Sequence, residues 1–180
     1  PAHVEAVAQG EEREFNKLEA CPHVEVGPAA SATPTAWAAA MAADFMRQRA
    51  DSNEPWLFSL NTFDPHHPFR IPRDHVDEWR RRVADLPSPA FSPEELRNKP
   101  VWQRIDHEGA YGGRGLNWNA LTESDHQWLR AAYYAMVEDI DRHVGTLIAT
   151  LEETDQREDT MIVFHSDHGE MLGDHGIYLK

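Results

Sequence analysis

Two short polar clusters hold most of the side chains in this sequence that could perform chemistry. They occupy residues 64–69 (DPHHPF) and 166–170 (SDHGE). In the second cluster, Asp167 and His168 offer an oxygen and a nitrogen donor side by side, which is half of a divalent-metal site. Gly169 would let the backbone turn sharply just after these two donors. A bound dication would neutralise an anionic substrate and polarise it toward nucleophilic attack.

Other interpretations of the same residues stay open at this level. An Asp-His-Gly triplet after a strand also fits a plain turn, in which Asp167 accepts hydrogen bonds from backbone N–H groups. Taken alone, His66 and His67 are more typical of a surface loop than of a ligand pair. The glycine-rich run at 109–115 lacks the strand–turn–helix setting of a phosphate-binding loop, so we interpret it as a flexible connection. We expect no chemical role for Cys21.

Each polar cluster follows a short apolar segment that is bounded by residues typical of turns. This pattern predicts buried strands at 56–60 and 160–164. In open α/β sheets, ligands bind outside the carboxyl ends of the strands. The two polar clusters could therefore face one site.

The helices predicted around these strands complete an α/β arrangement. Thr33 as N-cap and Pro34 at the first helical position start a helix that continues through 35–49. A short helix is predicted at 74–83, and we interpret its terminal arginines as a solvated face. The clearest helix begins after Thr122, and its apolar residues recur every three or four positions for most of thirty residues. That stripe predicts packing against a sheet.

The remaining segments divide the chain as follows. Residues 1–32 lack a sustained period, and we predict a loop or a weakly ordered surface segment. Residues 33–84 are predicted to be a helix–strand–helix unit, and 121–180 a long helix, a strand and a metal-site loop. Residues 85–120 are rich in proline, glycine and asparagine and predict a long irregular loop, which we expect on the substrate side because loops of this length are typical of lids and binding segments.

Composition excludes several classes of protein. The 180 residues match the size of one domain, and 17 basic against 31 acidic residues give a formal charge of −14. Such a charge disfavours binding to nucleic acid or to anionic membranes. No stretch approaches the 18 or so uncharged apolar residues of a membrane-spanning helix. One cysteine excludes an internal disulfide framework and a cysteine-rich zinc site. Because the sequence starts without Met and stops just after its most motif-like stretch, we expect an internal piece of a longer protein.

Three blocks of this sequence resemble the type I sulfatases of the alkaline-phosphatase-like superfamily. Residues 166–180 (SDHGEMLGDHGIYLK) closely resemble a signature block, 56–69 are similar to a second block, and 133–141 (YYAMVEDID) match the helix that links them. The resemblance covers residues 33–180. It implies an α/β fold, part of an alkaline-phosphatase-like sandwich with a central mixed, mostly parallel sheet flanked by helices, and it implies that 1–180 is a fragment of a single sulfatase catalytic domain.

The resemblance also implies roles for individual residues. Asp167 matches the family's metal-binding aspartate, and His168 takes a position where other members have Asn or His. Lys180 matches the lysine that grips the sulfate and polarises it. His66 matches the histidine that hydrogen-bonds a sulfate oxygen or the leaving group. His175 lies in the same signature block and is a candidate for lining the substrate pocket.

The cofactors that the resemblance implies are a divalent metal and a formylglycine nucleophile, made from Cys or Ser in a Cys/Ser-x-Pro-x-Arg motif. The sequence at Cys21 does not fit that motif, because proline comes one place early and no arginine follows. We therefore expect the nucleophile, and the paired aspartates that complete the metal site, upstream of this fragment, which alone should be inactive. Family sites of this kind commonly hold Ca²⁺, and the softer His168 leaves Mn²⁺ or Mg²⁺ as alternatives.

The implied function is hydrolysis of sulfate esters, with a small-molecule or carbohydrate sulfate ester as substrate. Two alternatives remain open: a phosphonate monoester or phosphodiester hydrolase of the same superfamily, and a noncatalytic relative that binds metal or a sulfated glycan. The missing nucleophile motif would discriminate between them. We expect substrate specificity to depend on residues 85–120 and on parts of the protein outside this sequence.

Overall fold

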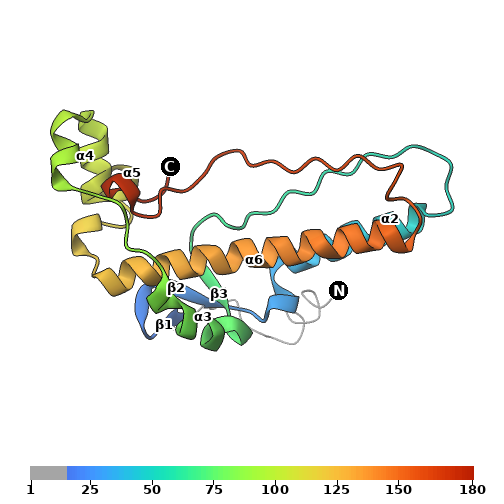
Figure 1. Cartoon of the computed structure of the whole chain (residues 1–180), viewed down its shortest axis with the longest axis horizontal. Coiled ribbons are helices and arrows are strands. Elements are labelled where there is room, and N and C mark those ends of the chain that lie inside the picture. Colours follow the sequence, from blue (N-terminus) through green and yellow to red (C-terminus); the bar gives the residue numbers. More distant parts are fainter. Residues whose placement is uncertain (1–15) are drawn as a thin grey trace.

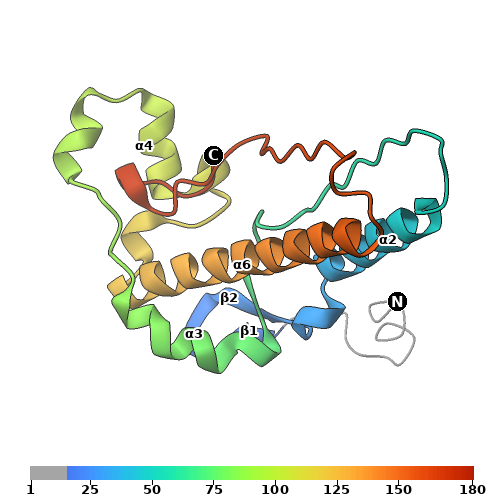
Figure 2. The ribbon, with the colours of Figure 1, turned by 45° about the vertical axis from the view of Figure 1, so that its right-hand side comes forward.

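The structure, a computed structural model, describes residues 16–180. Its longest helix, α6 (Glu123–Glu153), runs through the middle of the fold. The other helices are α2 (Pro34–Arg49), α3 (Val76–Arg82), α4 (Val101–Glu108) and α5 (Ala110–Gly113). The strands are β1 (Asn16–Leu18), β2 (Cys21–Gly27) and β3 (Arg70–Pro72). The sheet and α3 lie on one side of α6, and two extended segments lie on the other (Figures 1 and 2).

The three strands form a small mixed sheet that packs on α6. β2 is central, antiparallel to β1 and parallel to β3. The core that joins sheet and helix contains Leu18, Cys21, Val24, Phe69, Ile71, Trp79, Trp128, Leu129 and Met136. β1 and β2 correct the prediction of a loop at 1–32, of which residues 1–15 lie outside the described part. The strands escaped detection because β2 sends only two apolar side chains, Cys21 and Val24, fully into the core.

The predicted helix starts are confirmed in atomic detail. The Thr33 side chain accepts a hydrogen bond from the Ala36 N–H at 3.0 Å, as an N-cap should. Thr122 and Asp125 form a reciprocal capping box at the start of α6. These caps satisfy N–H groups that the first helical turn leaves without partners. The N-cap residues Thr33 and Thr122 therefore determine where α2 and α6 begin.

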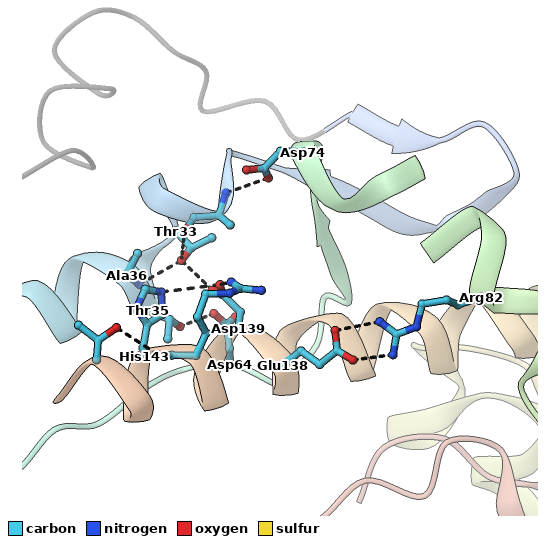
Figure 3. A network of polar contacts seen from close by, with 12 residues as sticks. Thr33, Thr35, Ala36, Asp64, Asp74, Arg82, Glu138, Asp139 and His143 are labelled. Atoms are coloured by element: carbon cyan, nitrogen blue, oxygen red, sulfur yellow. Dashed lines mark hydrogen bonds and ion pairs between the residues drawn. The ribbon is translucent and has the colours of Figure 1, made fainter. Parts of the chain in front are cut away.

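The short helix α3 departs from its prediction in one respect. The structure confirms a helix here, but the guanidinium of Arg82 is not simply solvated: it lies over the Trp79 ring and bonds both carboxylate oxygens of Glu138 on α6, at 2.6 and 3.0 Å (Figure 3). Because both side chains are partly exposed, the pair contributes only about 0–1 kcal/mol. Its main effect is to fix the orientation of α3 on α6.

The two predicted strands at 56–60 and 160–164 are extended segments, not strands, in the described part of the chain. Leu57 is 92% exposed and Met161 is 88% exposed, so the prediction of burial is also wrong for these residues. A buried strand needs hydrogen-bonding neighbours and covering layers on both faces. Residues 16–180 supply neither at this location, and the apolar pattern alone cannot pair the backbone.

Residues 85–120 are more regular than predicted. They contain α4, α5 and 3-10 turns at Pro93–Asn98 and Trp118–Ala120. α4 turns polar residues inward: Gln103 and His107 are buried, while Trp102 is exposed. Polar side chains are buried here, and an aromatic one is exposed, because α4 packs against backbone carbonyls of a loop near the C-terminal end, as described below. Within residues 16–180, no helix combines the length and the apolar character that crossing a bilayer requires.

Candidate active site

Three of the predicted site residues meet at one point. The ammonium nitrogen of Lys180 lies 2.8 Å from Nε2 of His66 and 2.8 Å from Nε2 of His168. The two imidazole rings have centroids 6.0 Å apart. The extended segments that precede them are joined at their other ends, where the Trp56 indole donates to the Gln156 side chain at 3.2 Å. The two segments therefore run in the same direction and deliver both polar clusters to one place.

The hydrogen bonds at Nδ1 determine what the two histidines present to Lys180. Nδ1 of His66 lies 2.7 Å from the His67 carbonyl oxygen, and Nδ1 of His168 lies 2.9 Å from the Gly169 carbonyl oxygen. A carbonyl only accepts, so Nδ1 carries the proton in each ring. In the neutral tautomer, Nε2 then offers a lone pair, and the ammonium donates to both rings. The arrangement holds a positive charge at the end of two loops.

Asp167 and His168 have the geometry of a partial metal site. The Asp167 carboxylate is largely exposed, and one of its oxygens lies 3.6 Å from Nε2 of His168. In this structure the Nε2 lone pair of His168 accepts from Lys180, so the carboxylate oxygen and this nitrogen can bind one ion only once the ammonium has moved aside. The Nδ1 bond to a carbonyl is the usual way to orient such a ligand. Within residues 16–180, no group of three or more acidic, histidine or cysteine side chains could enclose a metal. The residues present fit half of a site.

The loop from Glu170 to Lys180 is built to hold the lysine in place. Its backbone folds back on itself, with the Met171 N–H donating to the Leu179 carbonyl at 3.2 Å. The Glu170 carboxylate closes the loop, because its Oε1 accepts from the N–H groups of Leu172 at 3.1 Å and Leu179 at 2.5 Å. Burial raises the pKa of Glu170 above its ordinary value. Leu179, the residue before Lys180, is thus anchored by a carboxylate nine positions upstream.

Side chains of α6 also anchor this loop. Arg130, almost fully buried, donates from Nε to the Leu172 carbonyl at 3.2 Å and forms an ion pair with Asp174. The His126 ring and the Tyr178 hydroxyl lie within 2.6 Å of each other. Both contacts come from the first third of α6. The helix that carries the fold therefore also fixes the loop that carries Lys180.

Residues 85–120 hold the loop from the opposite side. The Trp118 indole donates to the Gly173 carbonyl at 3.0 Å, and Nδ1 of His107 on α4 donates to the Gly176 carbonyl at 2.6 Å. A Cβ at Gly173, whose φ is +84°, would lie 2.8 Å from the Pro89 side chain, so both conformation and space require glycine there. The segment predicted as an irregular loop is thus a scaffold for the Lys180 loop.

His175 is not part of the Lys180 cluster. Its Nδ1 lies 2.9 Å from a carboxylate oxygen of Glu95, its backbone N–H donates to the Ala90 carbonyl, and its side chain is exposed. The hydrogen bond from His175 lowers the pKa of Glu95. The structure places His175 where the Lys180 loop meets residues 85–120, and its predicted role in lining the substrate pocket stays a prediction.

The aromatic surroundings of His66 could not be predicted from the sequence. The Phe63 ring lies 4.9 Å from it, and the His67 ring stacks on its other side at 4.0 Å. Tyr111 of α5 lies 5.5 Å from His67. His67, which taken alone is typical of a surface loop, therefore joins His66 to a tyrosine in the segment interpreted as a flexible connection.

A buried polar network positions the loop that carries His66. Thr35 in the first turn of α2 donates to the Asp64 carboxylate at 2.5 Å, and Asp64 lies two residues before His66. Next to it, Thr33 donates to the buried carboxylate of Asp139 on α6 at 3.0 Å (Figure 3). The N-terminus of α2 thus links the His66 loop to α6.

Comparison with known proteins assigns the family. The model of the sulfatase family, described as "Sulfatase", matches residues 8–180. The chain belongs to the sulfatase family. It is similar to an arylsulfatase of Clostridium perfringens, with 30% identity over 82% of this chain and 28% of the relative, and to a choline-sulfatase of Rhizobium meliloti, with 33% identity over 72% of this chain and 24% of the relative. The chain spans about a quarter of the length of these relatives.

A solved structure supports the same assignment. The phosphonate monoester hydrolase of Silicibacter pomeroyi superposes with a TM-score of 0.72 at 27% identity, over 97% of this chain and 37% of the other. The likeness confirms the predicted α/β fold of the alkaline-phosphatase-like hydrolases.

Proposed function

We propose that the protein containing this chain hydrolyses sulfate esters and that these residues supply part of its active site. Family membership supports the reaction class. The observation that carries the proposal is the Lys180 ammonium, placed 2.8 Å from Nε2 of both His66 and His168. Positive charge and N–H donors at one fixed point suit an anionic tetrahedral group such as sulfate.

Lys180 and His66 have different roles in binding the substrate and stabilising the transition state. The ammonium donates hydrogen bonds to non-bridging sulfate oxygens and stabilises the negative charge that they carry in the transition state. Nε2 of His66 accepts from Lys180 in this structure. Once the ammonium donates to the sulfate instead, a protonated Nε2 can donate to a sulfate oxygen or to the alcohol oxygen. When the sulfur–oxygen bond breaks, that alcohol oxygen needs a proton, and His66 is placed to provide it.

Asp167 and His168 would hold a divalent metal together with ligands from outside these residues. We propose Ca²⁺, with Mn²⁺ or Mg²⁺ as alternatives. A bound dication would supply Lewis-acid stabilisation, and a formylglycine outside these residues would supply the nucleophile.

The metal assignment can be tested by metal analysis of the intact protein. Asp167→Ala should lower the bound metal and the activity together, because a dication site cannot spare its charged ligand. Asp159→Ala is the matched control, since Asp159 is an exposed aspartate in the turn just before the second extended segment. Full metal content in Asp167→Ala would remove this residue from the site.

A phosphonate monoester hydrolase is the second candidate, favoured by the solved structure that this chain resembles. Peptide mass spectrometry of the intact protein, produced in cells able to make formylglycine, tests the nucleophile. A formylglycine upstream of these residues would support sulfate ester hydrolysis. An unmodified Cys, Ser or Thr would favour phosphoester chemistry or a protein that only binds.

A further inference from the structure

Tyr111 has a backbone conformation that large side chains rarely adopt. Its φ is +57° and its ψ is +44°, in the left-handed region. This conformation costs a residue with a Cβ free energy, and glycine or asparagine normally takes it. The next two residues, Gly112 and Gly113, also have positive φ values and are glycines. A bulky aromatic residue with positive φ in a glycine-rich turn points to a use for its ring.

The turn that holds Tyr111 is tightly defined. The preceding residue, Ala110, is buried in the core, and its N–H donates to the Leu116 carbonyl at 3.1 Å. A Cβ at Gly109 would lie 2.7 Å from the Cα of Gly113, so the crossing of these two backbones requires glycine. The direction of the Tyr111 side chain is therefore set by an anchored turn and not by a free loop.

The Tyr111 ring lies next to the candidate active site. It lies 5.5 Å from His67, which stacks on His66 at 4.0 Å, and His66 is the direct neighbour of Lys180. Burial lowers the pKa of His67, and the nearby His66 and Lys180 lower it further. His67 therefore presents a neutral aromatic ring at neutral pH. The rings of His67 and Tyr111 thus lie in a row next to His66, one of the residues that would bind the sulfate.

Tyr111 still has surface available for a ligand, since 44% of it is exposed. A residue whose only task was to fill the core would be covered, and glycine would serve the turn better. The leaving-group part of a sulfate ester held by Lys180 and His66 must extend away from them, and a flat apolar group gains by packing against an aromatic face.

We propose that Tyr111 is a specificity-determining residue that packs against the leaving group of the ester and favours aromatic alcohols over small aliphatic ones. This inference rests on the proposed sulfate ester hydrolysis. It assigns a function to the glycine-rich turn of residues 109–115, which holds the ring at the edge of the site.

The test compares two substrates and matched variants of the intact protein. Tyr111→Asn removes the ring but keeps a residue that tolerates positive φ, Tyr111→Gly gives the turn its preferred residue, and Tyr111→Phe keeps the ring. Trp102→Ala is the control, because Trp102 is an exposed aromatic residue on α4. For each variant, kcat/KM is measured on 4-nitrophenyl sulfate and on ethyl sulfate, relative to the unaltered protein, so that differences in leaving-group acidity cancel.

The expected result is a selective loss. Tyr111→Asn and Tyr111→Gly should lower kcat/KM for the aryl ester by about tenfold and for the ethyl ester by less than about twofold, while Tyr111→Phe and Trp102→Ala stay near the unaltered value for both. An equal loss on the two esters, or no loss on the aryl ester, overturns the role of Tyr111 and leaves the proposed function standing. If the unaltered protein hydrolyses neither ester, the proposed function fails and this inference falls with it.

Discussion

Replacing Glu170 tests whether one carboxylate closes the loop that carries Lys180. In Glu170→Ala, the N–H groups of Leu172 and Leu179 lose the acceptor that now lies 3.1 and 2.5 Å away. A hydrogen bond to a charged group contributes about 1.5–3 kcal/mol. The ionised carboxylate loses water on folding, which raises the pKa of Glu170, and this desolvation cost offsets part of the sum. We therefore expect the loop to lose about 2–4 kcal/mol of local stability.

Glu170→Gln separates the hydrogen bonds from the charge. Its amide oxygen can replace Oε1 as acceptor for both N–H groups, so the loop should keep most of its stability. The pH dependence should differ. Because burial raises the pKa of Glu170 in the folded state, the folded protein favours the protonated acid, and this stabilisation is lost as pH rises through the folded pKa. The unaltered loop should thus gain stability as pH falls from 7 toward that pKa, and the Gln variant should not.

Hydrogen exchange of the intact protein, followed by mass spectrometry of peptides that span 170–180, measures this local stability. Faster exchange in Glu170→Ala but not in Glu170→Gln, with peptides from α6 unchanged, is the expected outcome. Equal protection in the Ala variant and the unaltered protein would refute the role of the carboxylate. Equal losses in both variants would show that the charge, and not the acceptor, closes the loop.

Four further predictions address the site, its support and the core. Lys180→Ala should lower kcat/KM for a sulfate ester about 10²- to 10³-fold, as loss of an oxyanion donor does. His66→Ala should lower kcat/KM more than His67→Ala does; the reverse order would assign the donor role to His67. Arg130→Met should lower the free energy of unfolding in urea by about 1–3 kcal/mol, because the Leu172 carbonyl loses its donor and Asp174 loses an ion pair; an unchanged midpoint would contradict this. Burial raises the pKa of the Cys21 thiol to about 12, so iodoacetamide at pH 8 should label it only after unfolding; rapid labelling of the native protein would show that it is accessible.

The features best predicted from the sequence are those that depend only on residues close together in the chain. The caps at Thr33 and Thr122 fixed the starts of α2 and α6, because an N-cap acts within its own first turn. The structure brings the two polar clusters close together, because the Lys180 ammonium lies 2.8 Å from both His66 of the first cluster and His168 of the second; that they form one active site stays a prediction. The clusters meet because both follow segments that run in the same direction.

Features that depend on distant partners were missed. The apolar pattern at 56–60 predicted a buried strand, but within residues 16–180 the segment has no strand partner, and Phe45 of α2 covers only one of its faces. α4 resisted detection because its buried side chains, Gln103 and His107, are polar and bind carbonyls far along the chain. Tyr111 lies in a run of glycines whose sequence resembles a free linker, and only the packing of Ala110 reveals a fixed turn.

Steady-state kinetics of the intact protein on the sulfate ester and the phenylphosphonate monoester of 4-nitrophenol would test the proposed reaction most directly. We predict a higher kcat/KM for the sulfate ester and a loss of that activity in Lys180→Ala. A preference for the phosphonate ester, or sulfate hydrolysis that survives Lys180→Ala unchanged, would contradict the proposal that these residues serve sulfate ester hydrolysis.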